Sequence, residues 1–111
     1  MQYMLMIHND PSTHPTPGDP EWGQLMADYA AFSEQLGSYT GAPLNDPSTA
    51  TTVRIRNGET LVVDGPFEET KEWMSGYYVI ECDNLDQALK AAAMVPSAKF
   101  GSVEVRPVAE M

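Results

Sequence analysis

The chain has 111 residues, a length that suits one domain, and we expect a single domain over residues 1–111. Hydrophobic residues make up 42% of the chain and its mean hydropathy is −0.32, which argues against a disordered tail; no apolar run approaches the roughly 20 residues of a membrane-spanning helix. Sixteen acidic against six basic residues give a net charge of −10, a field that repels phosphate backbones and argues against direct nucleic-acid binding.

The opening residues, MQYMLMIHND, contain no basic segment of the kind that begins an export signal, so we expect a cytoplasmic protein. The single cysteine, Cys82, excludes an internal disulfide framework and a cysteine-rich zinc site. It has no electropositive neighbour in the sequence, and we expect a buried, unreactive thiol.

Two stretches rich in proline and other turn residues interrupt the first half of the chain, Asn9–Asp19 and Gly37–Ser48. Proline fixes its own φ angle and cannot donate a backbone hydrogen bond, so we expect both stretches to be irregular. The run before them, Gln2–His8, is short and apolar, which is typical of a buried strand.

A helix is predicted over Pro20–Leu36. The residue before it, Asp19, is of a type that accepts hydrogen bonds from the free amides of a first turn, and proline fits the first helical position. The apolar side chains that follow recur at spacings of three and four, which places them on one face. They are Trp22, Leu25, Met26, Tyr29, Phe32 and Leu36. Gly37 suits the end of this helix.

The dipeptide Asn57-Gly58 predicts a tight β-hairpin, because both residues tolerate a positive φ angle. The flanking runs Thr51–Arg56 and Glu59–Val63 are its expected strands, and Asp64-Gly65-Pro66 is expected to end it. A two-residue loop also fixes the register. The expected partners are Arg56 with Glu59, Arg54 with Leu61, and Val53 with Val62.

The rest of the chain predicts a connector, a strand, a helix and a last strand. The connector is the polar segment Phe67–Met74, and the strand is Ser75–Cys82, which is rich in Tyr, Val and Ile. The helix is Asn84–Val95, whose first and fourth residues resemble a capping box. The last strand is Gly101–Pro107, in which apolar and polar residues alternate.

The predicted order is β-α-β-β-β-α-β. Without one strand of the hairpin it becomes the split β-α-β arrangement of an α+β, ferredoxin-like fold, an antiparallel sheet with both helices on one face. The other face then has no helix to cover it. In so small a chain a second copy is the natural cover, which predicts a homodimer.

All three arginines lie on predicted strands, at Arg54, Arg56 and Arg106. One interpretation is a pocket on the open sheet face in which Arg54 and Arg106 bind a small anionic molecule through their forked guanidinium groups, beside Tyr77. The alternative is ordinary ion pairing with glutamates of neighbouring strands or of a second subunit.

Asp64 stands at a strand end, where a partly desolvated carboxylate can act as a general base. Alternatively it accepts hydrogen bonds from the amides of its own turn. The ideal register places it on the face of Val53, opposite the arginines, so a shared site requires a bulge or a re-aimed turn. His8 is the lesser catalytic candidate, as an acid–base group at the end of a central strand.

His8, His14 and Asp10 contain metal-ligating groups, but three ligands in one proline-rich region are weak evidence for a metal site. The sequence contains no glycine-rich phosphate loop, no G-x-S-x-G motif and no Cys/His nucleophile pair. We therefore expect neither a metal nor a cofactor.

A resemblance to a known family is carried by DGPFEETKE at residues 64–72 and GYY at residues 76–78. Shorter matches run along the chain: YML at 3–5, ATTVR at 50–54, NLDQAL at 84–89 and GSVEVRP at 101–107. In these segments the chain resembles the YCII-related family, in its DGPF branch.

The resemblance implies a ferredoxin-like protomer that dimerises into an α+β barrel. It implies less about activity, since some members look like enzymes with a His–Asp pair in a cleft and others are linked to extracytoplasmic-function sigma factors. Here the first predicted helix contains no histidine, and Phe100 stands where many DGPF relatives have His or Tyr. Of that pair only Asp64 carries over.

Three hypotheses follow. The first is a homodimeric protein that binds a small molecule near Asp64, whether or not it is an enzyme of the lyase, isomerase or hydrolase type. The second is a non-catalytic accessory protein that binds a basic partner such as a sigma factor, which the charge of −10 would suit. In the third, the DGPF turn only builds the dimer.

Overall fold

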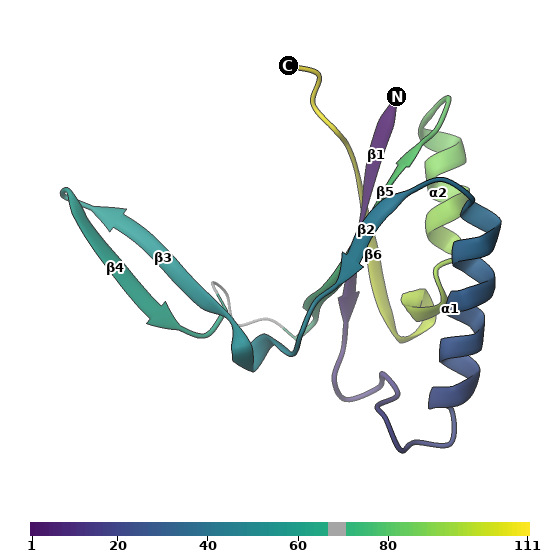
Figure 1. Cartoon of the computed structure of the whole chain (residues 1–111), viewed down its shortest axis with the longest axis horizontal. Coiled ribbons are helices and arrows are strands. Elements are labelled where there is room, and N and C mark those ends of the chain that lie inside the picture. Colours follow the sequence, from purple (N-terminus) through teal and green to yellow (C-terminus); the bar gives the residue numbers. More distant parts are fainter. Residues whose placement is uncertain (67–70) are drawn as a thin grey trace.

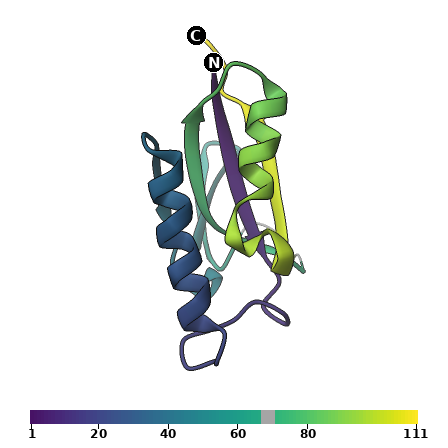
Figure 2. The ribbon, with the colours of Figure 1, turned by 90° about the vertical axis from the view of Figure 1, so that its right-hand side faces the viewer.

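The computed structural model describes residues 1–66 and 71–111 and shows an α+β fold with a four-stranded antiparallel sheet (Figure 1). The sheet order is β2–β5–β1–β6. Its strands are β1 (Gln2–Asn9), β2 (Thr40–Pro43), β5 (Trp73–Glu81) and β6 (Gly101–Pro107). The helices α1 (Trp22–Leu36) and α2 (Leu85–Ala93) lie side by side on one face of the sheet (Figure 2). This is the ferredoxin-like arrangement that the sequence predicts.

The core lies between this face and the helices. In β1 the buried side chains are Tyr3, Leu5 and Ile7, which alternate with less buried ones because successive residues of a strand point to opposite faces. Leu5 is fully buried. The other core residues are Ile80 on β5, Phe32 on α1, and Ala88, Ala92 and Val95 in and after α2.

The two helices differ in how they begin. Asn84 caps α2, since its side chain accepts a hydrogen bond from the backbone N–H of Gln87, as predicted. The predicted cap of α1 is wrong, because the carboxylate of Asp19 accepts from the backbone N–H and hydroxyl of Thr16 instead. The helix accordingly begins at Trp22 and not at the predicted Pro20.

The stretch that was expected to be irregular around residue 40 contains β2, so this prediction is wrong. Pro43 is tolerated because β2 is an edge strand and the proline ends it. Gly41 is required there, since a Cβ at this position would lie 2.2 Å from the carbonyl oxygen of Tyr77. The glycine and proline that hid the strand in the sequence are therefore the residues that fit it to the sheet edge.

The hairpin forms as predicted but does not join the sheet. Its strands β3 (Thr51–Arg56) and β4 (Glu59–Asp64) pair in the expected register around Asn57 and Gly58, whose φ angles are 53° and 78°. They form a separate two-stranded sheet that projects away from the helices (Figure 1), which we call the arm. The third and fourth strands of the ferredoxin-like order are thus β5 and β6. The prediction that one hairpin strand belongs to the main sheet, with Arg54 on its open face, is wrong, because both arm strands are an insertion.

The segment after the arm differs partly from its prediction. Residues 67–70 of the expected connector lie outside the described residues, and Trp73 and Met74 already belong to β5. The last strand, Gly101–Pro107, has the predicted bounds.

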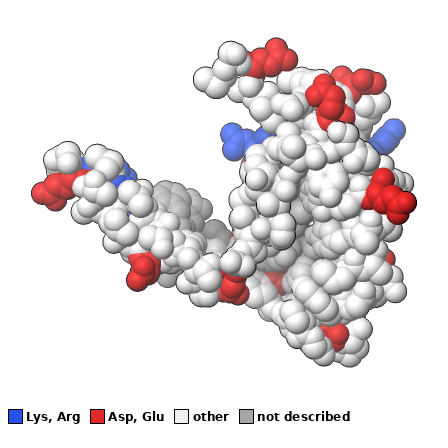
Figure 3. All heavy atoms as spheres, in the orientation of Figure 1, with Lys and Arg blue, Asp and Glu red and all other residues white. Residues whose placement is uncertain are grey.

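The sheet face opposite the helices is bare in the described chain. Its central side chains come from β1 and β5, and none of them is fully buried. They are Met4, Met6, Tyr77 and Val79. Neither α1 nor α2 has the length and apolar character that crossing a bilayer requires. Figure 3 shows acidic side chains spread over the visible surface and not gathered in one patch.

Candidate functional site

A cavity of about 430 Å³ lies between α1 and the strands β1, β2 and β5, and we call it the helix-side pocket. Its walls are largely apolar and include aromatic residues, with Trp22 and Tyr29 from α1 and Tyr39 and Tyr78 from the sheet side. The Tyr78 ring packs edge-on against Tyr39 at 5.1 Å and against Phe32 at 5.3 Å between ring centroids. These contacts on two sides hold one wall of the pocket in place.

Three polar side chains from distant parts of the chain meet at this pocket. The His14 Nε2 atom lies 2.9 Å from the Ser97 hydroxyl oxygen, and the Tyr29 hydroxyl donates to the same oxygen at 2.6 Å. All three residues line the pocket, and Ser97 is only 1% exposed.

The direction of these hydrogen bonds follows from the other ring nitrogen of His14. The Nδ1 atom lies 2.8 Å from the carbonyl oxygen of Pro15, which can only accept, so Nδ1 carries a proton. In the neutral ring Nε2 is then an acceptor, and the Ser97 hydroxyl donates its proton to it. The Ser97 oxygen is left to accept from Tyr29, and the three contacts form one consistent chain.

Local structure explains why His14 reaches this position. The Asp10 carboxylate accepts from the backbone N–H and hydroxyl of Ser12, and the Asp10 carbonyl accepts from the N–H groups of Thr13 and His14. The Thr13 hydroxyl donates to the carbonyl of Phe100, which ties the loop to the end of the short 3₁₀ segment Pro96–Phe100. Asp10 thus folds the loop, and Thr13 fixes it beside Ser97.

Two further groups influence the pocket. Burial raises the pKa of the Tyr29 hydroxyl, so that it remains a neutral donor at neutral pH. Asn9 also lines the pocket, and its side-chain oxygen is buried with no hydrogen-bond partner among the described residues. A buried acceptor without a partner is uncommon and would be satisfied by a hydroxyl or amine of a bound molecule, or by water.

Apart from Tyr77, which also borders the helix-side pocket, the site residues predicted from the sequence lie elsewhere. Asp64 is exposed at the end of β4, opposite Thr51, and borders an open cavity of about 660 Å³. Its other lining residues in the described chain are Pro11, Asp46, Pro47, Ser48, Gly65, Pro66 and Trp73, with no arginine among them. By the alternation of the observed register, Arg54 lies on the other face of the arm from Asp64, as expected.

The remaining three predicted residues share the bare sheet face but do not converge. The His8 Nε2 atom lies 3.5 Å from a carboxylate oxygen of Glu104, too far for a good hydrogen bond. Arg106 pairs with Met4, and Met4 is four residues from His8 along β1. At the rise of a strand, these two levels of the sheet are about 13 Å apart. Tyr77 pairs with Met6, between those two levels.

The described residues contain no group of three metal-ligating side chains. Asp10, which the sequence places near His8 and His14, uses its carboxylate to accept from Ser12 and lies 3.6 Å from the Lys71 ammonium. These interactions lower the pKa of Asp10. Cys82 is half-buried and not fully buried as predicted, and its partial burial raises the pKa of the thiol.

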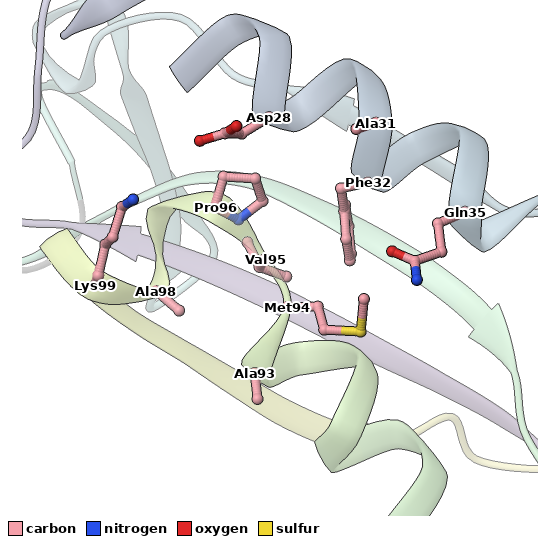
Figure 4. A pocket seen from close by; sticks show the side chains of 10 residues that line it. All are labelled: Asp28, Ala31, Phe32, Gln35, Ala93, Met94, Val95, Pro96, Ala98 and Lys99. Atoms are coloured by element: carbon pink, nitrogen blue, oxygen red, sulfur yellow. The ribbon is translucent and has the colours of Figure 1, made fainter. Parts of the chain in front are cut away.

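A third depression, of about 340 Å³, lies between α1 and the end of α2 (Figure 4). The apolar side chains of Phe32 and Val95 separate its polar groups, with Asp28 and Lys99 on one side and Gln35 on the other (Figure 4). The Asp28 carboxylate already accepts from Gln24 at 2.8 Å. This surface does not bring polar groups to one point.

The model of the YCII-related domain matches residues 1–111, the whole chain. The protein belongs to the YCII-related family. This YCII-related chain is also 38% identical over 117 residues to "Uncharacterized protein R00369" of Rhizobium meliloti (strain 1021), which covers 98% of this chain and 93% of that protein. The expected membership of the YCII-related family is confirmed, whereas the DGPF branch stays a prediction, and the relative's name assigns no activity.

Sequence reasoning missed the three residues that the fold brings together. In the sequence Tyr29 is one of the apolar side chains of the predicted helix, His14 is one residue of a weakly supported metal site, and Ser97 belongs to no motif. His14 and Tyr29 are 15 positions apart, and Tyr29 and Ser97 are 68 positions apart. The available signal was indirect: a hydroxyl on an otherwise apolar helix face, and a serine next to Pro96 at a helix end.

Proposed function

We propose that this protein binds a small organic molecule in the helix-side pocket. The observation that carries the proposal is the hydrogen-bond chain of Tyr29, Ser97 and His14 at a largely apolar cavity of about 430 Å³. Ligand sites in proteins are typically concave and mostly apolar, with a few polar groups that fix orientation, at volumes of roughly 300–1,000 Å³. The pocket has each of these properties.

The lining also restricts the ligand class. Trp22, Tyr39 and Tyr78 suit a flat ring or a short apolar chain. No lysine or arginine is among the described lining residues, so a strongly anionic ligand would have no counter-ion there. We expect an uncharged or weakly polar ligand with one hydrogen-bonding group directed at Ser97 or Asn9.

The test is a thermal-shift screen of the full chain against a library of small aromatic and short-chain metabolites. A ligand that binds only the native state raises the melting midpoint with concentration. Met26→Trp is the blocking variant, because Met26 lines the pocket and is 40% exposed, so a larger side chain is tolerated by the fold. Met94→Trp is the matched control, an exposed methionine that lines the depression of Figure 4.

Stabilisation of the wild type and of Met94→Trp, but not of Met26→Trp, supports binding in the helix-side pocket. Equal shifts of the melting midpoint in all three proteins place the ligand elsewhere. The proposal is contradicted if none of the compounds raises the melting midpoint of the wild type.

A second candidate site is a chamber on the bare sheet face, closed by a second copy of the chain. The bare face and the projecting arm favour it, because the arm of a partner can bring Asp64 to residues that lie apart from it in one protomer, while Arg54 lies on the other arm face. Arg106 and Tyr77 of the sheet face would then complete a site for a small anion, and His8, about 13 Å from the level of Arg106, would lie at its far end. In the same screen, loss of a ligand's effect in Asp64→Asn but not in Met26→Trp selects this chamber.

A further inference from the structure

We infer that Ser97 is an acyl-accepting nucleophile, with His14 as its general base, for small uncharged esters that fit the helix-side pocket. The inference rests on the proposed function and adds a reaction class to the same site. It is carried by the hydrogen-bond chain of Tyr29, Ser97 and His14 and by the cavity beside it.

A serine attacks a carbonyl carbon only when a base removes its proton, and the base must be held in the correct tautomer. The Pro15 carbonyl provides this orientation, since its 2.8 Å contact fixes the proton of His14 on Nδ1. The other nitrogen, Nε2, lies 2.9 Å from the Ser97 oxygen, within the range of a working nucleophile–base pair. Nucleophile, base and orienting group are thus all present within this chain.

The reaction has two balanced steps. The Ser97 oxygen bonds to the ester carbonyl carbon while its proton passes to His14 Nε2, and the carbon–oxygen bond to the leaving alcohol then breaks as His14 returns the proton to that alcohol. Water next attacks the acyl carbon and gives its proton to His14, and the bond to Ser97 breaks as the serine oxygen recovers the proton. The products are an alcohol and a carboxylic acid.

The Tyr29 hydroxyl is placed to assist. It lies 2.6 Å from the Ser97 oxygen and donates to it, so it is next to the position where the carbonyl oxygen acquires negative charge. Burial favours its protonated form, which keeps the donor available. The unsatisfied oxygen of Asn9 lies at the same pocket and can receive a hydroxyl or amine of the substrate.

The experiment measures turnover of p-nitrophenyl acetate and trapping by diisopropyl fluorophosphate, whose phosphorus would bond to the Ser97 oxygen as fluoride leaves. The full-length wild type is compared with Ser97→Ala, His14→Gln and Ser102→Ala. Ser102, on the opposite side of the sheet, donates to Glu72 and is the matched serine control. Peptide mass mapping of the trapped wild type locates the adduct without relying on any variant.

An adduct on Ser97, with turnover lowered about 100-fold in Ser97→Ala and His14→Gln but unchanged in Ser102→Ala, supports the inference. Acylation only of lysines or of the N-terminus, or equal turnover in wild type and Ser97→Ala, overturns it. If the inference is overturned in this way but library ligands still bind the pocket in the thermal-shift screen, the nucleophile role of Ser97 fails and the proposed function stands. If none binds, the proposed function fails as well.

Discussion

At the scale of single residues, Asp10 decides where His14 lies. Its carboxylate and carbonyl groups together accept hydrogen bonds from Ser12, Thr13 and His14, which folds the chain tightly after β1. The residue is 8% exposed, and the hydroxyl and N–H of Ser12 are the main cause of the lowered pKa of its carboxyl group. The position of His14, the candidate base, therefore depends on the ionised carboxylate of Asp10. The sequence alone suggests this carboxylate only as a metal ligand.

This ionisation predicts a pH dependence of stability. The pKa of Asp10 is lower in the folded protein than in the unfolded chain, where it is about 3.9. Its contribution is therefore fully present above that value and is lost as the pH falls through the folded pKa. We expect Asp10→Asn to lower the melting midpoint at pH 7 and the difference from wild type to shrink below about pH 4.

Glu34→Gln is the control, because it removes one carboxylate from an exposed position of α1. A difference between Asp10→Asn and wild type that stays constant from pH 7 to pH 3 would show that the charge of Asp10 does not contribute.

At the scale of elements, the sequence predicts those parts of the fold that local chemistry determines. The alternation of apolar and polar residues in Gly101–Pro107 is enough to predict that strand. The turn at Asn57-Gly58 is enough to predict the register of the hairpin. Strand β2 was missed because Gly41 and Pro43 are unfavourable in strands generally and fit only at this edge, beside Tyr77. The start of α1 was misplaced because the local turn Thr16–Asp19 competes for the carboxylate of Asp19, which accepts from Thr16 and not from the first turn of the helix.

The candidate site was less predictable than the fold. The interaction of Ser97 with Tyr29 spans 68 positions, and no local pattern records such a contact. The site residues chosen from the sequence were those with evident chemistry, such as Asp64 and Arg106, and one protomer leaves them apart on the arm and on the bare sheet face.

The cap of α2 gives the prediction at this scale. Asn84 accepts from the N–H of Gln87, while the Gln87 side chain accepts from the N–H of Asp83, so two amides of the helix start are satisfied. We expect Asn84→Ala to lower the free energy of unfolding by about 1 kcal/mol in urea denaturation. Lys90→Ala, an exposed change to another good helix former, should alter it by less than about 0.5 kcal/mol. An equal effect of both changes would contradict the capping role.

At the scale of the whole molecule, the arm is the feature that one chain does not explain. Isolated two-stranded hairpins are at best marginally stable in water. Here apolar side chains of both arm faces are exposed, at 41–62%. They are Val53, Ile55 and Val62 on one face and Leu61 and Val63 on the other. A hairpin with water on both sides would not need apolar residues on both, so we propose that each arm is covered in a homodimer.

The charges on both surfaces are compatible with a second copy as the cover. The arm carries Arg54 and Arg56 beside Glu59, and the bare sheet face carries Glu81 and Glu104 beside Arg106. An arm that crosses to the sheet face of its partner would bring opposite charges together around an apolar centre of methionine and tyrosine side chains. The principal extents of 47 × 42 × 19 Å describe a flat protomer whose arm can reach beyond its own body.

The prediction is that wild-type protein elutes with the mass of a dimer in size-exclusion chromatography with light scattering, and that Ile55→Glu with Val62→Glu shifts it to a monomer. Two carboxylates on the apolar arm face would be buried without partners in the dimer, and this cost opposes association. Leu85→Glu with Leu89→Glu is the matched control, because these side chains are 48% and 47% exposed on α2. It should leave the mass unchanged. A monomeric wild type, or a dimer that survives the arm substitutions, would show that the arm has another role and would remove the chamber proposed at Asp64.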